Sequence, residues 1–366
     1  MSGTSADAID AVLLRTDGIA PPQVLAHAVT PYPAEVRRQV LSLYEPGADE
    51  LDRMGQLDQT LGQLFAQAAL AVIQRGGMVP TQVQVIGSHG QTIRHRPPHF
   101  TVQIGNPFVI AAETGITTVA NFRPADMARC GEGAPLTPLF HQALFAKAGQ
   151  RIAVVNLGGI ANLTALSGDP ASPLLAGDTG PANTLLDLLA ALTSDGRETH
   201  DRDGGQAAQG SVHPDALAWL LAEPFFRRPF PKSTGRELFG LPFLQRFMQA
   251  FPALSVVDCF ATLSALTVRT VAMACRQTLA PAPHQLILCG GGTKNRELVR
   301  QLQQELPESQ ILASDALGVD VETLEAQAFG WFAVRTLRHL PSSLPGATGA
   351  REAAVLGAVH PATRTF

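Results

Sequence analysis

The stretch Ala176–Asn183, with the sequence AGDTGPAN, carries the most information about this chain. It follows the apolar run Pro173–Ala176, which predicts a strand, and it precedes Thr184–Ala190, whose apolar spacing predicts a helix. Asp178 therefore falls between a predicted strand and the start of a predicted helix. A carboxylate held at such a junction can accept a proton or bind a metal ion, so Asp178 is a candidate catalytic base.

The small residues around Asp178 support this interpretation. Gly177 and Gly180 would let a substrate approach the backbone closely. Pro181 is suited to a first helical turn, where its missing N–H costs nothing. The alternative is that Asp178 only caps the helix.

Length and composition favour a folded enzyme of two domains. The chain has 366 residues, which is more than one ordinary core accommodates. Hydrophobic residues make up 45% and charged residues 16%, which argues against a disordered chain. The net charge of -4 provides no basic stripe for nucleic acid, and we expect no nucleic-acid partner.

Cysteine, histidine and apolar patterns bound the cellular setting. The ten histidines show no metal-ligand spacing, so we predict no zinc site. No apolar run of about 20 residues is evident, and the N-terminus lacks a signal-peptide pattern, so we expect a cytoplasmic protein without a membrane segment. The cysteines are scattered without a CxxC pair, which predicts reduced thiols that are mostly buried: Cys130, Cys259, Cys275 and Cys289.

Strand and helix signals alternate in two halves. Each half opens with two strands joined by a turn, Ile9–Leu14 with Val24–Val29 and Ile152–Asn156 with Ile160–Leu166. Further predicted strands are 83–87, 117–120 and 285–289, and predicted helices are 51–75, 254–279, 295–305 and 323–340. The pattern predicts an α/β protein, with its domains joined near the Gly/Pro-rich stretch 131–135.

Glycine turns occur at three places, Gly3–Ser5, Leu157–Gly159 and Gly290–Gly292. Such turns can point backbone N–H groups at phosphate oxygens, although a plain tight turn is the alternative for each. Hydroxyl or amide side chains lie beside all of them, which favours nucleotide phosphates: Thr4, Ser5, Asn156, Asn162 and Thr293. Neither a GxxxxGK[ST] loop nor a GxGxxG motif after a first strand is present.

Two carboxylates follow the first glycine turn. Asp7 and Asp10 could hold or orient the Mg²⁺ that phosphoryl transfer requires. The alternatives are a turn residue for Asp7 and an outward strand position for Asp10.

Motifs along the whole chain identify it as similar to a known family. These are GTSADAID (3–10), SHGQTIRHRP (88–97), QIGNPFVIAAETGI (103–116), GEGAPLTPLFH (131–141), VVNLGGIANLT (154–164), GDTGPANTLLD (177–187), KSTGRELF (232–239), CGGGTKN (289–295), LEAQAF (324–329) and LPGATGA (344–350). In this order they resemble the anhydro-N-acetylmuramic acid kinases, which belong to the superfamily of sugar kinases, actin and heat-shock chaperones.

The resemblance implies a fold and a reaction. The fold is a two-domain, actin-like (ribonuclease H-like) α/β ATPase with ATP and sugar in the interdomain cleft. We expect 1–130 with 345–366 to form the first domain and 131–344 the second. In the reaction, water opens the 1,6-anhydro bridge of 1,6-anhydro-N-acetylmuramic acid at C1 while ATP phosphorylates O6, during peptidoglycan recycling. ATP and Mg²⁺ are the implied cofactors, and a homodimer is the implied assembly.

The resemblance also implies roles for individual residues. Asp178 would be the base, and Glu325 would orient it or the metal, although a capping or salt-bridge role is the alternative for Glu325. The implied ATP-binding residues are Gly3, Thr4, Ser5, Asp7, Asp10, Asn156, Gly158, Gly159, Asn162, Gly290, Gly291, Gly292 and Lys294. The implied sugar-binding residues are His89, Gly90, Gln91, Arg123, Arg129, Thr179 and Asn183. The two arginines are candidates for the lactyl carboxylate, with a surface charge as the alternative. Lys232–Arg236 matches a family motif whose position in the site does not follow from the sequence.

Departures from the family pattern give further expectations. Relatives usually carry an apolar strand before the first loop, whereas here Met1-Ser2 precede Gly3, so we expect weaker anchoring of that loop. Ala8 replaces a usual glycine, and strain would follow if its φ were positive. Asn121 replaces an Asp, and Ala182 replaces a Gly. Two alternative functions stay open: a non-catalytic nucleotide- or sugar-binding protein with an impaired first loop, and a kinase for another sugar.

Overall fold

The computed structural model describes residues 1–3, 6–169, 171–320 and 323–362, and it divides into two compact units. Unit 1 comprises Met1–Leu144 and Glu322–Phe366, and unit 2 comprises Phe145–Val321. Residues 131–144 and 322–344, which we expected in the second domain, thus group with unit 1. Helix α11 (Leu324–Leu337) accounts for this difference, because it packs on strands β1, β3 and β6 of unit 1, and its Trp331 contacts Phe140.

Unit 2 contains a five-stranded sheet in the order β11-β10-β7-β8-β9. Strands β7, β8 and β9 are antiparallel neighbours, whereas β10 and β11 run parallel to β7. Three antiparallel strands continued by parallel ones on the other side give the ribonuclease H-like order that the resemblance implies. The strands are β7 (Ile152–Leu157), β8 (Ile160–Leu166), β9 (Leu175–Pro181), β10 (Gln285–Cys289) and β11 (Gln310–Ala313).

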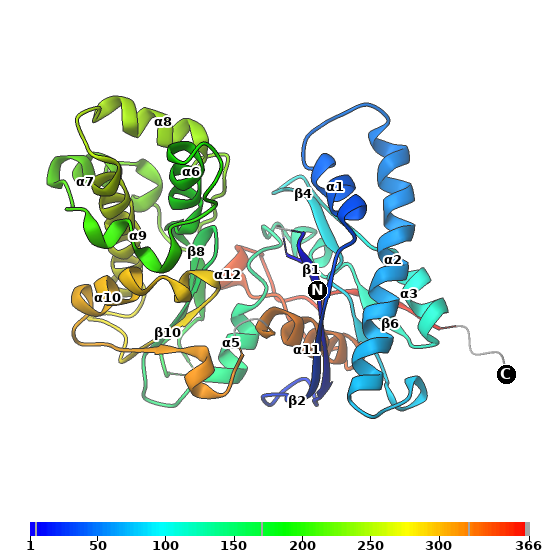
Figure 1. Cartoon of the computed structure of the whole chain (residues 1–366). Helices are drawn as coiled ribbons and strands as arrows, with labels where there is room; N and C mark the ends of the chain where they lie inside the picture. The colour runs from blue at the N-terminus through cyan, green and yellow to red at the C-terminus, as the bar shows by residue number, and fades with distance from the viewer. Residues whose placement is uncertain (4–5, 170, 321–322, 363–366) are drawn as a thin grey trace. The chain divides into compact units, whose positions relative to one another are not determined.

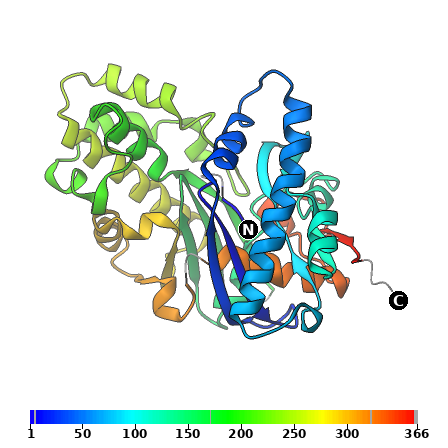
Figure 2. The ribbon, with the colours of Figure 1, turned by 45° about the vertical axis from the view of Figure 1, so that its right-hand side comes forward.

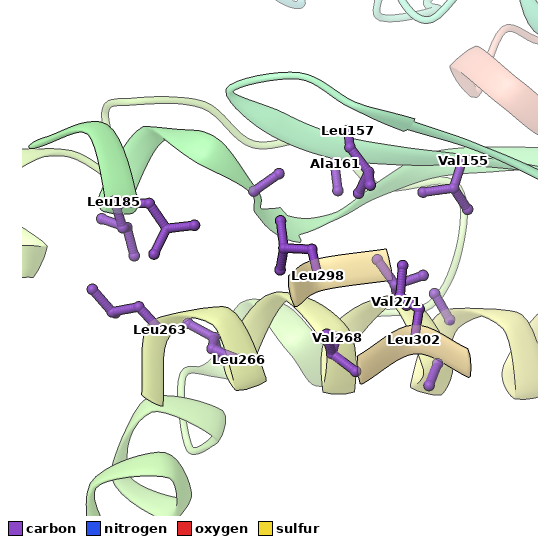
Figure 3. Packing of buried hydrophobic residues seen from close by; sticks show 14 of the residues in the cluster. Val155, Leu157, Ala161, Leu185, Leu263, Leu266, Val268, Val271, Leu298 and Leu302 are labelled. Carbon is purple, nitrogen blue, oxygen red and sulfur yellow. The ribbon is translucent and has the colours of Figure 1, made fainter. Parts of the chain in front are cut away.

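The core of unit 2 lies between this sheet and helix α9 (Val256–Thr278). Figure 3 shows Val155, Leu157 and Ala161 of the sheet facing Leu263, Leu266, Val268 and Val271 of α9, with Leu298 and Leu302 of α10 beside them. The other helices are α6 (Asn183–Thr193), α7 (Pro214–Leu221), α8 (Leu241–Ala250) and α10 (Arg296–Glu305), with short 3₁₀ turns η2 (Arg202–Gly204), η3 (Ala207–Gln209), η4 (Pro224–Arg227), η5 (Gly291–Lys294) and η6 (Ser314–Leu317).

Helix α9 is also long and apolar enough to cross a membrane by length and composition alone, although we had noted no such run. However, 72% of its apolar window is buried inside the structure. The run is therefore explained as the central core helix of unit 2.

Unit 1 is built around the hairpin of β1 (Ala8–Arg15) and β2 (Gln23–Pro31), which confirms the first predicted strand pair. Helix α2 (Glu50–Arg75) runs alongside this hairpin (Figure 1 and Figure 2) and confirms the predicted helix 51–75. The remaining elements are β3 (Ile86–Gly87), β4 (Gln91–Arg96), β5 (Phe100–Ile104), β6 (Thr118–Ala120), β12 (Ala358–His360), α1 (Ala34–Ser42), α3 (Pro107–Thr114), α4 (Pro124–Met127), α5 (Pro138–Phe145), α12 (Pro345–Thr348) and η1 (Pro80–Gln82).

The strands of unit 1 form separate small sheets, and a cavity lies beside β1. β1 pairs with β2, while β3 belongs to a three-stranded sheet in the order β12-β6-β3. The cavity has a volume of about 340 Å³ and is lined by residues of β1, of Gln82–Ser88, of α2 and of α11.

The Met1 ammonium donates to the Asp10 carbonyl and the Asp10 N–H donates to the Met1 carbonyl, both at 2.9 Å. Met1 therefore pairs with β1 on the edge away from β2.

The condition for strain at Ala8 is not met. Ala8 opens strand β1 and has no positive φ, whereas Ala6 adopts a φ of 51°. The left-handed position of the loop thus falls two residues earlier than the substitution that we had singled out.

Candidate active site

Asp178 lies within a strand, not at the end of one. Strand β9 runs from Leu175 to Pro181, so it continues through the glycine-rich motif that we had placed after a strand ending at Ala176. Asp178 pairs with Asn162 of β8, whereas Gly180 pairs with Ala161, and the register shifts between them. The residue left over in this bulge is Thr179, whose hydroxyl donates to the Ala161 carbonyl at 3.3 Å. Gly and Pro disfavour a strand in this segment, and its strand conformation depends on the hydrogen bonds with β8.

The helix-capping alternative for Asp178 is also wrong. Helix α6 begins at Asn183 with Ala182 as its N-cap, and no side chain caps it. Pro181 accordingly ends β9 instead of opening the helix. The Asp178 carboxylate oxygen Oδ2 accepts a hydrogen bond from the Thr234 backbone N–H at 2.8 Å, and the Asp178 N–H donates to the Lys232 carbonyl at 2.8 Å.

The turn between β7 and β8 lies against the start of α6. The Asn183 side-chain amide donates to the carbonyls of Leu157, at 3.0 Å, and Gly158, at 2.8 Å. The backbone N–H groups of Ala182 and Thr184 donate to the Gly159 carbonyl. Asn183, a predicted sugar contact, therefore fixes the shape of the Gly158–Gly159 turn.

Thr184 is a polar residue of this region that sequence reasoning missed. It is buried, and its hydroxyl has no hydrogen-bond partner among the described residues. A Cβ added to Gly159 would lie 2.7 Å from that hydroxyl, so the glycine brings the turn close to it. The sequence signal that could have identified Thr184 is a threonine in the first turn of a helix that follows a glycine-rich segment.

The third glycine turn, which follows β10, packs against the end of β7 and the start of α6. Gly290 has a φ of +80°, and a Cβ there would lie 2.1 Å from the Asn156 side-chain oxygen. A Cβ at Gly292 would lie 2.6 Å from the Leu157 Cβ and 3.2 Å from the Asn183 side-chain nitrogen. Unit 2 therefore brings most of its predicted residues together: Asn156, Gly158, Gly159, Asn162, Asp178, Asn183 and Gly290–Gly292. Lys294 is exposed at the end of η5.

In unit 1 the side chains of Arg123 and His89 are in contact. The Arg123 guanidinium contacts the His89 Nε2 from Nε at 3.2 Å and from Nη2 at 2.9 Å, and its Nη1 donates to the Gly133 carbonyl at 2.7 Å. The His89 Nδ1 lies 3.0 Å from the Gly90 carbonyl, which assigns the proton to Nδ1 and the acceptor to Nε2. Burial and the Arg123 charge hold the pKa of His89 well below its usual value, so the ring is neutral.

Gln91 is buried and fully engaged. Its amide oxygen accepts from the Ser2 hydroxyl at 2.6 Å, and its amide nitrogen donates to the Gly3 carbonyl at 3.1 Å and to the Tyr44 hydroxyl at 3.0 Å. Gln91, which we predicted to contact sugar, thus anchors the backbone that precedes the first glycine turn. Thr4 and Ser5 of that turn lie outside the described residues.

Glu325 and Asp10 form the acidic part of unit 1. Desolvation by surrounding protein atoms raises the pKa of the Glu325 carboxyl although the side chain reaches solvent, the Arg123 guanidinium opposes this shift, and the Asp10 carboxylate adds to it. The same desolvation lowers the pKa of Arg123 to about 10, and Glu325 opposes that shift. Glu325 therefore lies near enough to both Arg123 and Asp10 to interact with their charges.

Two other predicted residues of unit 1 form surface ion pairs. Asp7 pairs with Arg37 at 2.9 Å and is 63% exposed. Arg129 pairs with Glu352 at 3.2 Å. Exposed pairs of this kind contribute little to stability. For Arg129 this is the surface charge that we named as an alternative. In the described part of the chain, no group of three or more His, Cys, Asp and Glu side chains is arranged to hold a metal ion.

Comparison with known proteins agrees with the motifs. The sequence profile of the family described as anhydro-N-acetylmuramic acid kinase matches residues 1–362. Proteins of that name are 44% identical in Shewanella amazonensis, over 99% of this chain and 97% of the relative, and 46% identical in Bordetella pertussis, over 99% and 95%. The relative in Pasteurella multocida is 43% identical over 99% and 95%.

Solved structures resemble the chain more distantly. The activator of 2-hydroxyisocaproyl-CoA dehydratase from Clostridium difficile, with bound ADPNP, gives a TM-score of 0.41 at 10% identity, over 91% of this chain and 92% of that one. A ROK family glucokinase from Streptomyces griseus gives 0.37 at 13% identity, over 88% and 97%. Because these scores are low, the actin-like assignment rests on the strand order of unit 2. The full-length profile match and the three relatives show that the chain belongs to the anhydro-N-acetylmuramic acid kinase family.

Proposed function

We propose that this chain uses ATP to convert 1,6-anhydro-N-acetylmuramic acid into N-acetylmuramate 6-phosphate and ADP. Family membership over residues 1–362 supports the reaction. The observation that carries the assignment of the base is the position of Asp178, whose backbone and carboxylate are both fixed by hydrogen bonds to the segment Lys232–Thr234.

The proposed chemistry balances as one water addition and one phosphoryl transfer. The water oxygen bonds to C1 as the C1–O6 bond breaks, and O6 bonds to the γ-phosphorus as the bond to the ADP oxygen breaks. Asp178 accepts the proton that the water loses. A base must hold its water within about 3 Å through the reaction, and a carboxylate attached to a paired strand has few ways to move.

The glycine turns of unit 2 are the proposed nucleotide contacts. Gly158, Gly159 and Asn162 would hold phosphate oxygens, and Gly290–Gly292 with Lys294 would line the adenosine site. The close approaches at Gly159 and Gly290 support this, because any side chain there would collide with Thr184 or Asn156. We add the Thr184 hydroxyl as a proposed phosphate donor, since it is buried without a partner in the described structure.

Arg123 is the proposed contact for the lactyl carboxylate. Its guanidinium is oriented by His89 and by the Gly133 carbonyl, which leaves a planar cation fixed in one direction. His89 then acts through Arg123, and Gln91 acts through the first loop. Direct sugar contacts by His89, Gly90, Gln91, Arg129, Thr179 and Asn183 stay predictions.

Asp10 and Glu325 are the proposed magnesium-binding residues of unit 1. Asp10 and Glu325 carry carboxylate oxygens, which Mg²⁺ prefers, and Mg²⁺ would add to the Met1 ammonium and Arg123 in offsetting their mutual repulsion. Mg²⁺ would supply charge neutralisation at the phosphate oxygens. Asp7 fits less well, because Arg37 already neutralises it.

The alternatives have less support. A non-catalytic binding protein would not need the hydrogen bonds that fix Asp178, and a kinase for another sugar is not favoured by relatives that share one name. The cytoplasmic location and the homodimer stay predictions, and light scattering of the purified chain would measure its assembly.

Coupled ADP release from the purified chain tests the proposal. We expect ADP release with MgATP only when 1,6-anhydro-N-acetylmuramic acid is added, together with the ring-opened 6-phosphate detected by mass spectrometry. N-acetylmuramic acid, which lacks the anhydro bridge, is the matched control. ADP release that ignores the bridge would favour another sugar, and nucleotide binding without any release would favour the non-catalytic alternative.

A further inference from the structure

The family motif KSTGRELF begins with a lysine whose place in the chemistry was unassigned. Lys232 is 4% exposed and lies after the turn η4. Its ammonium donates to the carbonyls of Phe225, at 3.3 Å, and Phe226, at 3.2 Å. The ammonium also lies 4.8 Å from the centroid of the Phe225 ring and 5.0 Å from that of Phe230. A buried cation with two carbonyl acceptors and two ring faces is firmly anchored.

The backbone beside this ammonium holds Asp178. The Lys232 carbonyl accepts from the Asp178 N–H at 2.8 Å, and two residues later the Thr234 N–H donates to Asp178 Oδ2 at 2.8 Å. The loop also approaches β9 closely, because a Cβ on Gly177 would lie 2.7 Å from the Lys232 carbonyl oxygen and 2.9 Å from the Phe230 ring. The loop therefore contacts the strand directly at the candidate base.

We propose that Lys232 is a positioning residue for Asp178. Its anchored ammonium fixes the segment Lys232–Thr234, and that segment fixes the carboxylate through the Thr234 N–H. This inference deepens the proposed function and rests on it, since it gives Asp178 its orientation for the same reaction.

The charges around the loop agree with this arrangement. Burial lowers the pKa of Lys232, the nearby Arg228 lowers it further, and the Asp178 carboxylate opposes both effects. Lys232 is thus a charged group close enough to Asp178 to interact with it, while the residue paired with Asp178 on β8 is the uncharged Asn162. A hydrogen bond from Thr234 to the ionised carboxylate favours the charged, base-competent form.

The test compares Lys232→Met with Lys147→Met. Methionine matches the unbranched aliphatic stem of lysine but removes the ammonium, whereas Lys147 is exposed and outside the proposed site. For Lys232→Met we expect kcat to fall about 10- to 100-fold with little change in the KM for ATP. The acidic limb of the kcat profile should move to higher pH by about one unit, as expected when one charge-assisted hydrogen bond to a carboxylate is lost. Lys147→Met should match the wild type.

A purely structural lysine would give a different result. If Lys232→Met lowers the melting temperature but keeps the wild-type kcat and pH profile, the positioning role is wrong. If Lys232→Met does not fold, Lys232→Gln replaces it, because its polar amide suits a buried site while the variant removes the charge and shortens the anchor, and the same shift of the acidic limb is required. Asp178→Asn, measured in parallel, distinguishes the role of Asp178 as base from the role of Lys232 in positioning it. Near-normal turnover by Asp178→Asn would overturn the assignment of the base, regardless of the result for the Lys232 variants.

Discussion

In unit 1 the candidate site residues Arg123 and Gln91 are held by other side chains as well as by backbone carbonyls, whereas the candidate base of unit 2 is held by backbone atoms. Arg123 depends on the His89 ring, and Gln91 depends on Ser2 and Tyr44. Asp178, by contrast, is fixed by strand pairing and by the Thr234 N–H. The difference teaches that side-chain substitutions should disturb unit 1 most, while glycine substitutions should disturb unit 2 most.

Replacing Arg123 with Met tests the side-chain network and has the largest expected effect in this comparison. The sugar would lose a bidentate, charge-assisted contact, and His89 would lose its donor. We expect the KM for the sugar to rise about 100-fold with the KM for ATP nearly unchanged. Steady-state kinetics measure both, and Arg38→Met, an exposed arginine in α1, is the control. A change in the KM for ATP instead would show that Arg123 serves the nucleotide.

Replacing Gly290 with Ala tests the backbone-held side. The residue needs a φ of +80°, and the added Cβ would lie 2.1 Å from the Asn156 side-chain oxygen. We expect a loss of roughly 3 kcal/mol in the free energy of unfolding, together with weaker ATP binding. Gly291→Ala is the matched control for stability, because nothing lies within 4 Å of a Cβ there. Equal melting temperatures for the two variants would contradict the account of this turn.

The sequence predicts the elements of unit 2 well but not the path of β9. The hairpin of β7 and β8, helix α9 and the helix after Gly290–Gly292 are confirmed, because each has a clear apolar period. The segment GDTGP has the composition of a turn, and only pairing with β8 makes it a strand.

Partners that are distant in sequence could not be predicted. The Thr234 N–H that binds Asp178 lies 56 residues away, and backbone donors leave no trace in residue types. His89 and Gln91 as sugar contacts stay predictions, and their partners Arg123 and Ser2 could not be predicted because they depend on the tertiary fold. The grouping of α11 with unit 1 could not be predicted for the same reason, because the apolar pattern of a helix does not indicate which sheet the helix packs against.

Mild acid should change the stability of the two units in opposite directions. In unit 1, burial lowers the pKa of His141 to about 4 and that of His95 to about 4, and burial together with the Arg123 charge lowers that of His89 well below its usual value. A histidine with a lowered folded pKa contributes stability above its unfolded pKa near 6.5, and this stability is lost as the pH falls below that value. For His141 the loss is about 2 kcal/mol at pH 5.

Unit 2 has the opposite response at Asp187. Burial raises the pKa of this carboxyl to about 6, with His200 and Arg236 opposing, so protonation between pH 6 and 4 favours the folded state. Hydrogen exchange at pH 7 and pH 5, corrected for the intrinsic exchange rate, should show loss of protection in unit 1 but not around α6. Parallel losses in both units would contradict this assignment of the titrating groups.

Thiol reactivity gives the smallest expected contrast. Cys130 is exposed in unit 1, whereas Cys259, Cys275 and Cys289 are buried, and burial raises the pKa of Cys275 and Cys289 to about 12. We expect a disulfide reagent to modify one thiol rapidly and the other three only on unfolding. Cys130→Ser should remove the rapid phase. Rapid modification of a second thiol would show that the core of unit 2 opens more readily than its packing indicates.

The most direct test of the central claim is turnover by Asp178→Asn. Asparagine keeps the shape of the side chain and its acceptor for the Thr234 N–H, but it cannot take a proton from water. We predict unchanged ATP binding and melting temperature, with sugar-dependent ADP release lowered about 10²- to 10⁴-fold. Release within a few-fold of the wild type would contradict the claim that Asp178 is the base.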